Sequence, residues 1–131
     1  MENKKEAVHT ADAPAALGPY SQAIRTQGML FLSGQIPLDP KTSQIVGQTT
    51  GEQAEQVLKN MAAVLKAQGL DFSHVVKTTV FLKNMEDFTQ FNEVYGKHMT
   101  SPFPARSTVE VARLPKDVKI EIEAIAHYPN R

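Results

Sequence analysis

The sequence has no cysteine, no long apolar run and no excess of charge of either sign. The absence of cysteine excludes disulfides, thiolate metal sites and a cysteine nucleophile. Fourteen basic and fourteen acidic side chains give a formal net charge of zero. This balance weighs against DNA, RNA or an anionic membrane as the main partner, because such binding needs a basic surface. The first ten residues, MENKKEAVHT, contain no apolar stretch, so we expect no signal peptide, no membrane span and a cytoplasmic protein.

Several common catalytic motifs are also missing. The four histidines, His9, His74, His98 and His127, are far apart and show no H-x-x-x-H or H-E-x-x-H spacing, so we expect no metal site. Neither a phosphate-binding G-x-x-x-x-G-K-[ST] loop nor a dinucleotide-binding G-x-G-x-x-G motif is present. Ser33 is not part of a G-x-S-x-G elbow, which argues against a serine hydrolase.

Residues 50–68 are expected to form an amphipathic helix. Six apolar residues recur there at helical spacing: Ala54, Val57, Leu58, Met61, Val64 and Leu65. Thr50 and Gln53 fit a capping box at its start, and Gly69 fits a left-handed stop at its end. A second helix is expected from about Met85 to the prolines of TSPFPA. Its apolar face would consist of Phe88, Phe91, Tyr95 and Met99.

The remaining periodic stretches are typical of strands. MLFLSG follows a hairpin turn at Gln27-Gly28, and HVVKTTVFLKN is rich in β-branched residues. RSTVEVA and DVKIEIEAIAHY are joined only by RLPK, so we expect these two strands to pair antiparallel. The order of strands, helix, strand, helix and strands predicts one domain, residues 1–131. We expect a two-layer α/β sandwich in which both helices cover one face of a mixed β-sheet.

Alternation along the strands divides the predicted sheet into two faces. The residues expected beneath the helices are Val109, Val111, Val118, Ile120, Ile122, Ala124 and Ala126. The other face is expected to mix apolar and polar groups, namely Met29, Phe31, Phe81 and Ile125 with Arg106, Thr108, Glu110, Glu121 and Glu123. Exposed apolar patches of this kind usually mark an interface. We therefore expect this face to pack against copies of the same chain.

Arg106 and Glu121 are the candidate pair for chemistry on that second face. The arginine fork can hold a carboxylate through two hydrogen bonds. A glutamate near apolar groups has a raised pKa and can accept a proton from water. A simpler interpretation is that Arg106 forms an ion pair with Glu110 or Glu123 and that Glu121 faces solvent or pairs with Arg106. These patterns leave both interpretations open.

Five motifs are spread along almost the whole chain, from residue 13 to residue 126: APAALGPYSQA, LFLSGQIPLDPKT, VVKTTVFLKNMEDF, FNEVYG and FPARSTVEVARLPKDVKIEIEAIA. In these motifs the chain resembles the Rid family, and within it the RidA enamine/imine deaminases. The resemblance implies a chorismate-mutase-like fold and a homotrimer with active sites in clefts between neighbouring subunits. It also implies hydrolysis of 2-aminoacrylate, 2-iminopropanoate and 2-iminobutanoate to 2-keto acids and ammonia, without a cofactor. Such substrates are released by pyridoxal-phosphate enzymes such as serine/threonine dehydratases.

The same resemblance suggests roles for individual residues. Arg106 of PARS would bind the substrate carboxylate, and Glu121 of KIEIEA would activate water. Further pocket positions would be Tyr20, Ser33, Gly34 and Asn92. Many relatives read PARSCVEV, with cysteine where this chain has Thr108. We expect that the thiol is not essential, because a backbone contact at Thr108 would survive the change. The departure does weigh against a redox-switched chaperone role.

Two other functions are considered on the same residues. A regulatory protein could use the same cleft to sense a keto acid or an amino-acid metabolite, because a carboxylate clamp serves binding as well as turnover. An endoribonuclease that inhibits translation is the second alternative, since that activity is ascribed to some relatives. The zero net charge weighs against the nuclease.

Overall fold

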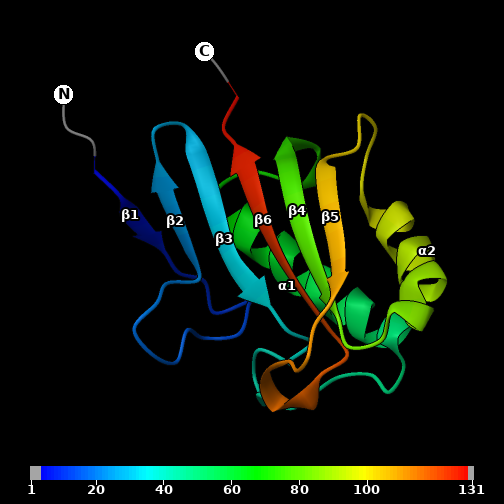
Figure 1. Cartoon of the computed structure of the whole chain (residues 1–131). Coiled ribbons are helices and arrows are strands. Elements are labelled where there is room, and N and C mark those ends of the chain that lie inside the picture. Colours follow the sequence, from blue (N-terminus) through cyan, green and yellow to red (C-terminus); the bar gives the residue numbers. More distant parts are fainter. Residues whose placement is uncertain (1–3, 130–131) are drawn as a thin grey trace.

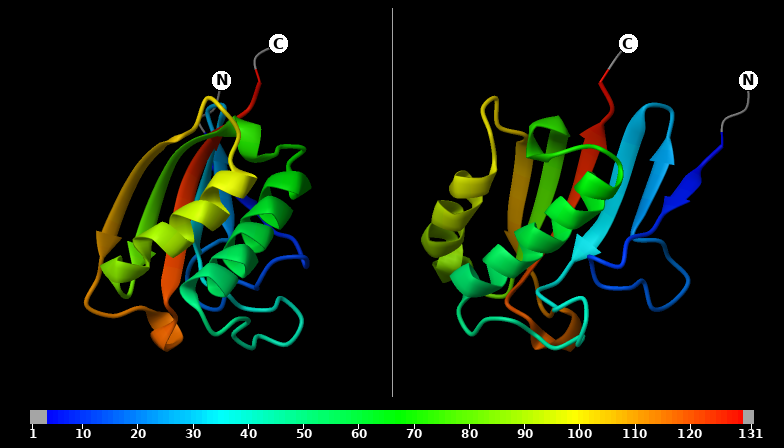
Figure 2. Two further views of the ribbon diagram at one scale, coloured as in Figure 1. Left: turned by 90° about the vertical axis from the view of Figure 1, so that its right-hand side faces the viewer. Right: turned by 180° about the vertical axis from the view of Figure 1, so that it is seen from behind.

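The computed structural model describes residues 4–129, which form a six-stranded sheet with two helices on one of its faces (Figure 1, Figure 2). The strands are β1 (Glu6–Val8), β2 (Ala23–Thr26), β3 (Met29–Gln35), β4 (Val75–Leu82), β5 (Ala105–Glu110) and β6 (Ile120–His127). The helices are α1 (Thr50–Ala67) and α2 (Phe88–His98), and short 3₁₀ turns lie at Phe72–His74, Met85–Asp87 and Pro115–Asp117. The predicted two-layer architecture is confirmed. Neither helix has the length and apolar character needed to cross a bilayer.

The strands lie in the order β1-β2-β3-β6-β4-β5, and β4–β5 is the parallel pair in an otherwise antiparallel sheet. The expected antiparallel pairing of the last two strands is therefore wrong, because β4 lies between them. The central place of β6 has a physical reason. Its inward side chains, Ile120, Ile122, Ala124 and Ala126, are all buried. At the centre of the sheet this apolar strand is hydrogen-bonded on both edges, whereas a terminal hairpin would leave one edge open.

The side of the sheet to which β5 turns its alternate residues also differs from the expectation. Arg106 and Thr108 pair with Thr78 and Val80 of β4, both of which are fully buried beneath the helices. Arg106, Thr108 and Glu110 therefore face the helix side, and Val109 faces the open side, where it is 42% exposed. The alternation within β5 was predicted correctly. The predicted orientation of β5 was wrong, because Arg106 has its hydrogen-bond partner in α2 and Glu110 has its partner just before α2.

The ends of α1 are set by local hydrogen bonds. Thr49, not Thr50, is the N-cap, and its capping box is completed by Glu52, one residue earlier than predicted. Gln53 instead donates to the Gly47 carbonyl and accepts a hydrogen bond from the backbone N–H of Lys119. That side chain thereby ties the start of α1 to the chain that enters β6.

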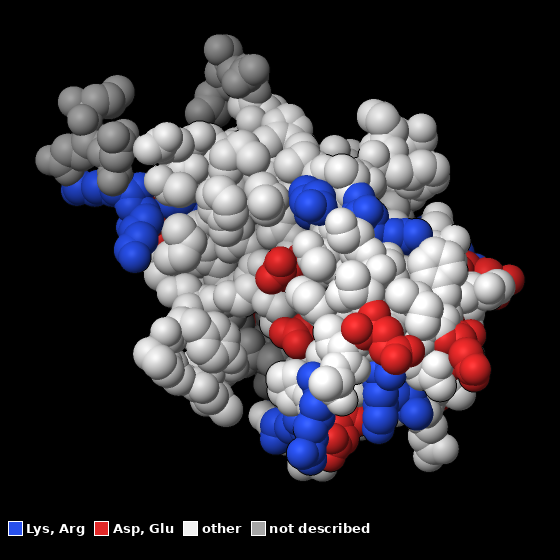
Figure 3. All heavy atoms as spheres, in the orientation of Figure 1, with Lys and Arg blue, Asp and Glu red and all other residues white. Residues whose placement is uncertain are grey.

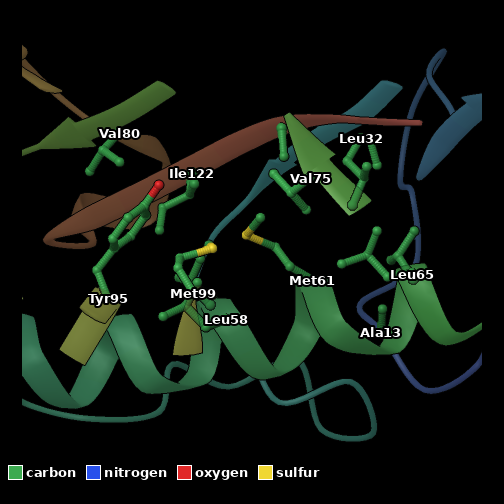
Figure 4. Close-up of a cluster of buried hydrophobic side chains, with 14 of the residues drawn as sticks. Ala13, Leu32, Leu58, Met61, Leu65, Val75, Val80, Tyr95, Met99 and Ile122 are labelled. Atoms are coloured by element: carbon green, nitrogen blue, oxygen red, sulfur yellow. The ribbon is translucent and has the colours of Figure 1, made fainter. Parts of the chain in front are cut away.

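The hydrophobic core fills the space between the helices and the inner face of the sheet (Figure 4). Leu58, Met61 and Leu65 of α1 point toward the strands, where they meet Leu32, Val75, Val80 and Ile122. The apolar stripe predicted for α1 is buried along its length. Of the four residues predicted on one face of the second helix, Phe91, Tyr95 and Met99 are buried and Phe88 is half-buried against the core.

The opposite face of the sheet has no covering layer in the single chain. Phe31 of β3 pairs with Ile125 of β6, and Phe81 of β4 pairs with Glu121 of β6. The apolar and polar mixture expected on this face is thus present in β3, β4 and β6. Figure 3 views the molecule from this side and shows acidic side chains among uncharged ones in the middle of the face.

Candidate active site

The seven candidate site residues fall into two groups. An arginine cluster consists of Arg106 and Thr108 of β5 with Asn92 of α2, and it lies on the helix side of the sheet. A glutamate cluster consists of Glu121 of β6, Ser33 and Gly34 of β3, and Tyr20 of the loop before β2. The expectation that Arg106 and Glu121 share one face is wrong, because β4 separates their strands and the two side chains leave the sheet on opposite sides.

The guanidinium of Arg106 is held by α2. Its Nη1 donates a hydrogen bond of 2.7 Å to Oδ1 of Asn92. Its central carbon lies 4.8 Å from the ring centroid of Tyr95, 5.4 Å from that of Phe88 and 5.5 Å from that of Phe91. Contacts at these distances are attractive cation–π interactions. The half-buried arginine is therefore oriented by neutral groups.

No carboxylate of residues 4–129 pairs with Arg106. Glu110, one of the partners considered from the sequence, instead accepts a hydrogen bond of 2.8 Å from the backbone N–H of Met85. Beside the guanidinium is an open hollow of about 390 Å³ lined by Asn92, Tyr95, Gly96, Phe103, Pro104 and Arg106. An arginine with spare N–H donors beside such a hollow is suited to binding a carboxylate from solution.

Thr108 lies two residues after Arg106 on the same side of β5. Its hydroxyl oxygen is buried and is the one buried side-chain polar atom in the described part of the chain that has no hydrogen-bond partner. A hydroxyl without a partner usually costs about 1–3 kcal/mol. No hydrogen bond among the described residues therefore accounts for a polar group at this position.

Glu121 lies close to the backbone of Gly34. A Cβ atom added to Gly34 would overlap Oε2 of Glu121, so only glycine leaves room for the carboxylate at this position. The register between β3 and β6 shifts between Leu32 and Gln35, which marks a bulge at the Ser33-Gly34 pair. The absence of a side chain at Gly34 thus lets the Glu121 carboxylate lie against the backbone of β3.

The environment of Glu121 raises its pKa. Burial is the main cause, and the negative charge of nearby Glu123 adds to it. A carboxylate with a raised pKa binds a proton more strongly than an ordinary glutamate. It is therefore a better general base toward water.

Tyr20 and Ser33 line a second hollow, of about 230 Å³, together with Gly34, Pro115 and Lys116. Tyr20 is 55% exposed. The hydroxyl of Ser33 donates a hydrogen bond of 2.6 Å to the carbonyl of Ser21. Ser33 therefore anchors the loop before β2, and Tyr20 brings an exposed hydroxyl group to this hollow.

Gln22 is a structural support of this cluster that the sequence patterns did not single out. Its side chain is buried, accepts from the backbone N–H of Thr10 at 2.7 Å and donates toward the carbonyls of Thr10, Ala13 and Pro14. These bonds hold the loop that carries Tyr20. A polar residue just before an apolar strand was the available sign, but such residues are usually exposed.

Residues 10–128 match the family model described as Endoribonuclease L-PSP. The Arabidopsis thaliana protein named Reactive Intermediate Deaminase A, chloroplastic, is 55% identical over 123 residues, which are 94% of this chain and 66% of that protein. The human protein named 2-iminobutanoate/2-iminopropanoate deaminase is 49% identical over 122 residues, or 93% of this chain and 89% of that protein. The chain belongs to the Rid family.

Solved structures of relatives share the fold of this Rid protein. Escherichia coli TdcF with bound serine has a TM-score of 0.87 and 44% sequence identity, and the match covers 95% of this chain and 99% of TdcF. The α+β architecture of a mixed sheet with two helices is thus the architecture of the Rid family. Among residues 4–129, no three His, Asp or Glu side chains are grouped so that they could hold a metal ion.

Proposed function

We propose that this Rid protein hydrolyses small 2-imino and 2-enamino acids, namely 2-aminoacrylate, 2-iminopropanoate and 2-iminobutanoate, to 2-keto acids and ammonia. The observation that carries the proposal is the pairing of two chemical features in one chain. Arg106 is oriented but has no carboxylate partner among residues 4–129, and Glu121 is half-buried with a raised pKa. The close human relative that is named as such a deaminase supports the same reaction. Pyridoxal-phosphate dehydratases in the cytoplasm would supply the substrates.

The active site of this proposal lies between two copies of the chain. Arg106 and Glu121 leave opposite sides of the sheet, so a small acid cannot readily contact both within one chain. Leu17, in the loop of the glutamate cluster, is 80% exposed, and Phe103, beside the arginine cluster, is 63% exposed. Exposed apolar groups of this size are typical of interfaces.

A homotrimer would satisfy this geometry. If the arginine cluster of one copy meets the glutamate cluster of the next, the contact joins two different surfaces. Contacts of that kind close into rings when the rotation between copies permits it. The resemblance to Rid proteins favours a ring of three, with three equivalent sites.

In the proposed mechanism Arg106 binds the substrate carboxylate and thereby places C2 next to a water molecule. Asn92 accepts a bond from Nη1, which leaves other N–H groups of the guanidinium for two parallel bonds to the acid. An enamine first tautomerises to the imine, whose C2 is the stronger electrophile. Tyr20, as an exposed donor of the glutamate cluster, would help to fix the acid.

Glu121 then acts as the proton carrier. It takes a proton from water as the water oxygen bonds to C2, and passes it to the imine nitrogen to give a tetrahedral carbinolamine. The hydroxyl proton of this intermediate follows the same route, C2=O forms, and the C2–N bond breaks. Both protons of the water end on nitrogen, which leaves as ammonia.

The test couples a purified dehydratase, fed with L-serine or L-threonine, to semicarbazide trapping of the released imine. Wild-type protein should lower the amount of trapped imine, whereas Arg106→Ala should have no effect while forming the same oligomer. Arg25→Ala is the matched control, because Arg25 also lies over an aromatic ring, that of Tyr128 at 4.3 Å, but outside both clusters. Near-normal turnover by Arg106→Ala would overturn the proposal.

The same assay separates the two alternatives. A regulatory protein would bind a keto acid tightly and leave the trapped imine unchanged. A ribonuclease would cleave RNA, and cleavage that survives both Arg106→Ala and Glu121→Ala would belong to another site or to a contaminant.

A further inference from the structure

We infer that Tyr95 is a positioning residue for Arg106, fixed from the sheet side by Thr78 and presenting its ring to the guanidinium. The inference rests on the proposed function, in which Arg106 binds the substrate carboxylate. Tyr95 does not touch the substrate in this scheme. It determines where the cation lies before the acid arrives.

Two successive contacts link the sheet to the guanidinium of Arg106, the first between Thr78 and Tyr95 and the second between Tyr95 and Arg106. The hydroxyl groups of Tyr95 and Thr78 are 2.7 Å apart and share a buried hydrogen bond. Figure 4 shows the tyrosine side chain extending from α2 with its hydroxyl toward the strands. At 4.8 Å, the ring of Tyr95 is the nearest of the three rings around the guanidinium carbon of Arg106.

The strand register provides a second link between Thr78 and Arg106. Thr78 of β4 is the residue paired with Arg106 in the parallel β4–β5 ladder. Thr78 therefore helps to fix both the backbone and the guanidinium of Arg106. It aligns the Arg106 backbone through the ladder, and it aligns the guanidinium through the hydroxyl of Thr78 and the ring of Tyr95.

Neutral partners suit a carboxylate-binding arginine. An acidic partner would occupy the fork and neutralise the charge, whereas an aromatic face attracts the cation and leaves its in-plane N–H groups available. A free arginine side chain has rotamer entropy of about 2 kcal/mol to lose on binding. Fixing the guanidinium beforehand reduces this cost, as in other preorganised sites.

Tyr95 differs from the other two rings because it has a polar end. Phe88 and Phe91 lie at 5.4 and 5.5 Å and have only packing to hold them. Burial raises the pKa of Tyr95 despite its hydrogen bond with Thr78 and the positive charge of Arg106. The phenol therefore stays protonated, and its bond to Thr78 persists at physiological pH.

The experiment measures the binding of pyruvate, a stable 2-keto acid, by calorimetry on the full chain. Tyr95→Leu, which removes the ring, should weaken binding about tenfold, within the range of a desolvated cation–π contact. Tyr95→Phe and Thr78→Val each remove the same hydrogen bond and keep the packing, so each should weaken binding about threefold. Because both lose one shared bond, the double variant should be no weaker than either single variant.

Coupling to Arg106 distinguishes positioning from a general structural role. In an Arg106→Lys background, where the planar fork is gone, Tyr95→Leu should weaken the remaining affinity less than twofold. Equal weakening in both backgrounds, or undiminished pyruvate binding by all three variants, would overturn the inference. Tyr128→Phe is the matched control, because it removes a part-buried hydrogen bond from a tyrosine hydroxyl to Gln68, outside both clusters. This variant should bind pyruvate as the wild type does.

The outcomes also separate this inference from the proposed function. If Arg106→Ala abolishes pyruvate binding while the Tyr95 and Thr78 variants bind normally, the inference fails and the proposed function stands. If Arg106→Ala binds pyruvate normally, the proposed function fails first. Should Tyr95→Leu not fold, Tyr95→Phe and Thr78→Val still decide the question, since both preserve the volume of the core.

Discussion

Arg106 and Glu121 leave the sheet on opposite sides and are separated by the strand between them. In β4, Arg106 pairs with Thr78 and Glu121 pairs with Phe81, and residues an odd number of positions apart on a strand point to opposite faces. Each residue nevertheless has surroundings suited to its proposed role. If both act on one small molecule, two copies of the chain must supply them.

Mixed oligomers test this consequence. Arg106→Ala and Glu121→Ala should each be inactive, but oligomers assembled from equal amounts of both should regain activity. A site that needs intact Arg106 from one copy and intact Glu121 from its neighbour would form in about a quarter of cases under random assembly. Turnover in the coupled dehydratase assay should therefore return to about a quarter of the wild-type value.

A mixture that stays as inactive as the single variants would mean that both residues act within one chain. Sedimentation of each variant serves as the control, since both must form the wild-type oligomer before they are mixed. The result does not depend on how fast the wild-type enzyme works.

Gly34→Ala should displace the Glu121 carboxylate, because the added Cβ overlaps its Oε2 atom. Displacement of a catalytic group by about 1 Å can lower kcat/KM about 10²-fold, and we expect a loss of that size. The melting temperature should change little, since the glutamate is at the surface of the sheet and can turn toward solvent. A variant with normal kcat/KM would show that the position of Glu121 over Gly34 does not matter for turnover.

Activity should depend on the ionisation of Glu121. Because burial and Glu123 raise the pKa of this carboxyl group, kcat/KM should rise with pH through a midpoint above the ordinary glutamate value of about 4.3. Glu123→Gln removes the neighbouring negative charge and should move that midpoint to lower pH. A midpoint that does not move in Glu123→Gln would argue that another group controls the profile.

The raised pKa of Glu121 should also make the stability of the fold depend on pH. Stability should fall as pH rises, whereas activity should rise. The folded protein binds the Glu121 proton more strongly than the unfolded chain, so ionising this group destabilises the fold as pH rises through the raised pKa. Glu121→Gln should therefore melt at a higher temperature than wild type at pH 7, and the difference should vanish near pH 4. The effect should be small, since the side chain is only half-buried. Equal differences at both pH values would contradict this account.

Gln22→Ala should loosen the loop that carries Tyr20. The glutamine side chain satisfies backbone groups of Thr10, Ala13 and Pro14, and leaving such groups without partners costs about 1–3 kcal/mol. Chemical denaturation should show a loss of that order. Gln44→Ala, at an exposed position, is the control and should leave the free energy of unfolding unchanged. Equal stability of the two variants would mean that the loop is held by other contacts.

Local structure could be read from the sequence because it depends on neighbouring residues. The hairpin turn predicted at Gln27-Gly28 has positive φ at both residues, as a two-residue type I′ turn requires. Gly69 follows the end of α1 with φ of +72°, which is the left-handed stop predicted there. The apolar period of α1 depends only on the spacing of apolar residues, and the end of α2 before TSPFPA depends only on the local prolines. The short strand β1 was not predicted, because three residues without a strong apolar pattern carry too little information.

The sequence by itself determined both helices, the strands other than β1, the helix-covered sheet and, through its long Rid motifs, which side chains were candidates. Only the tertiary structure decided that β6 enters between β3 and β4, and that Arg106 turns toward α2 while Glu121 turns away from it. Alternation shows which residues of one strand share a side, but strand pairing sets that side relative to other strands. Pairing depends on contacts between distant segments, so it follows from the packing of the whole chain.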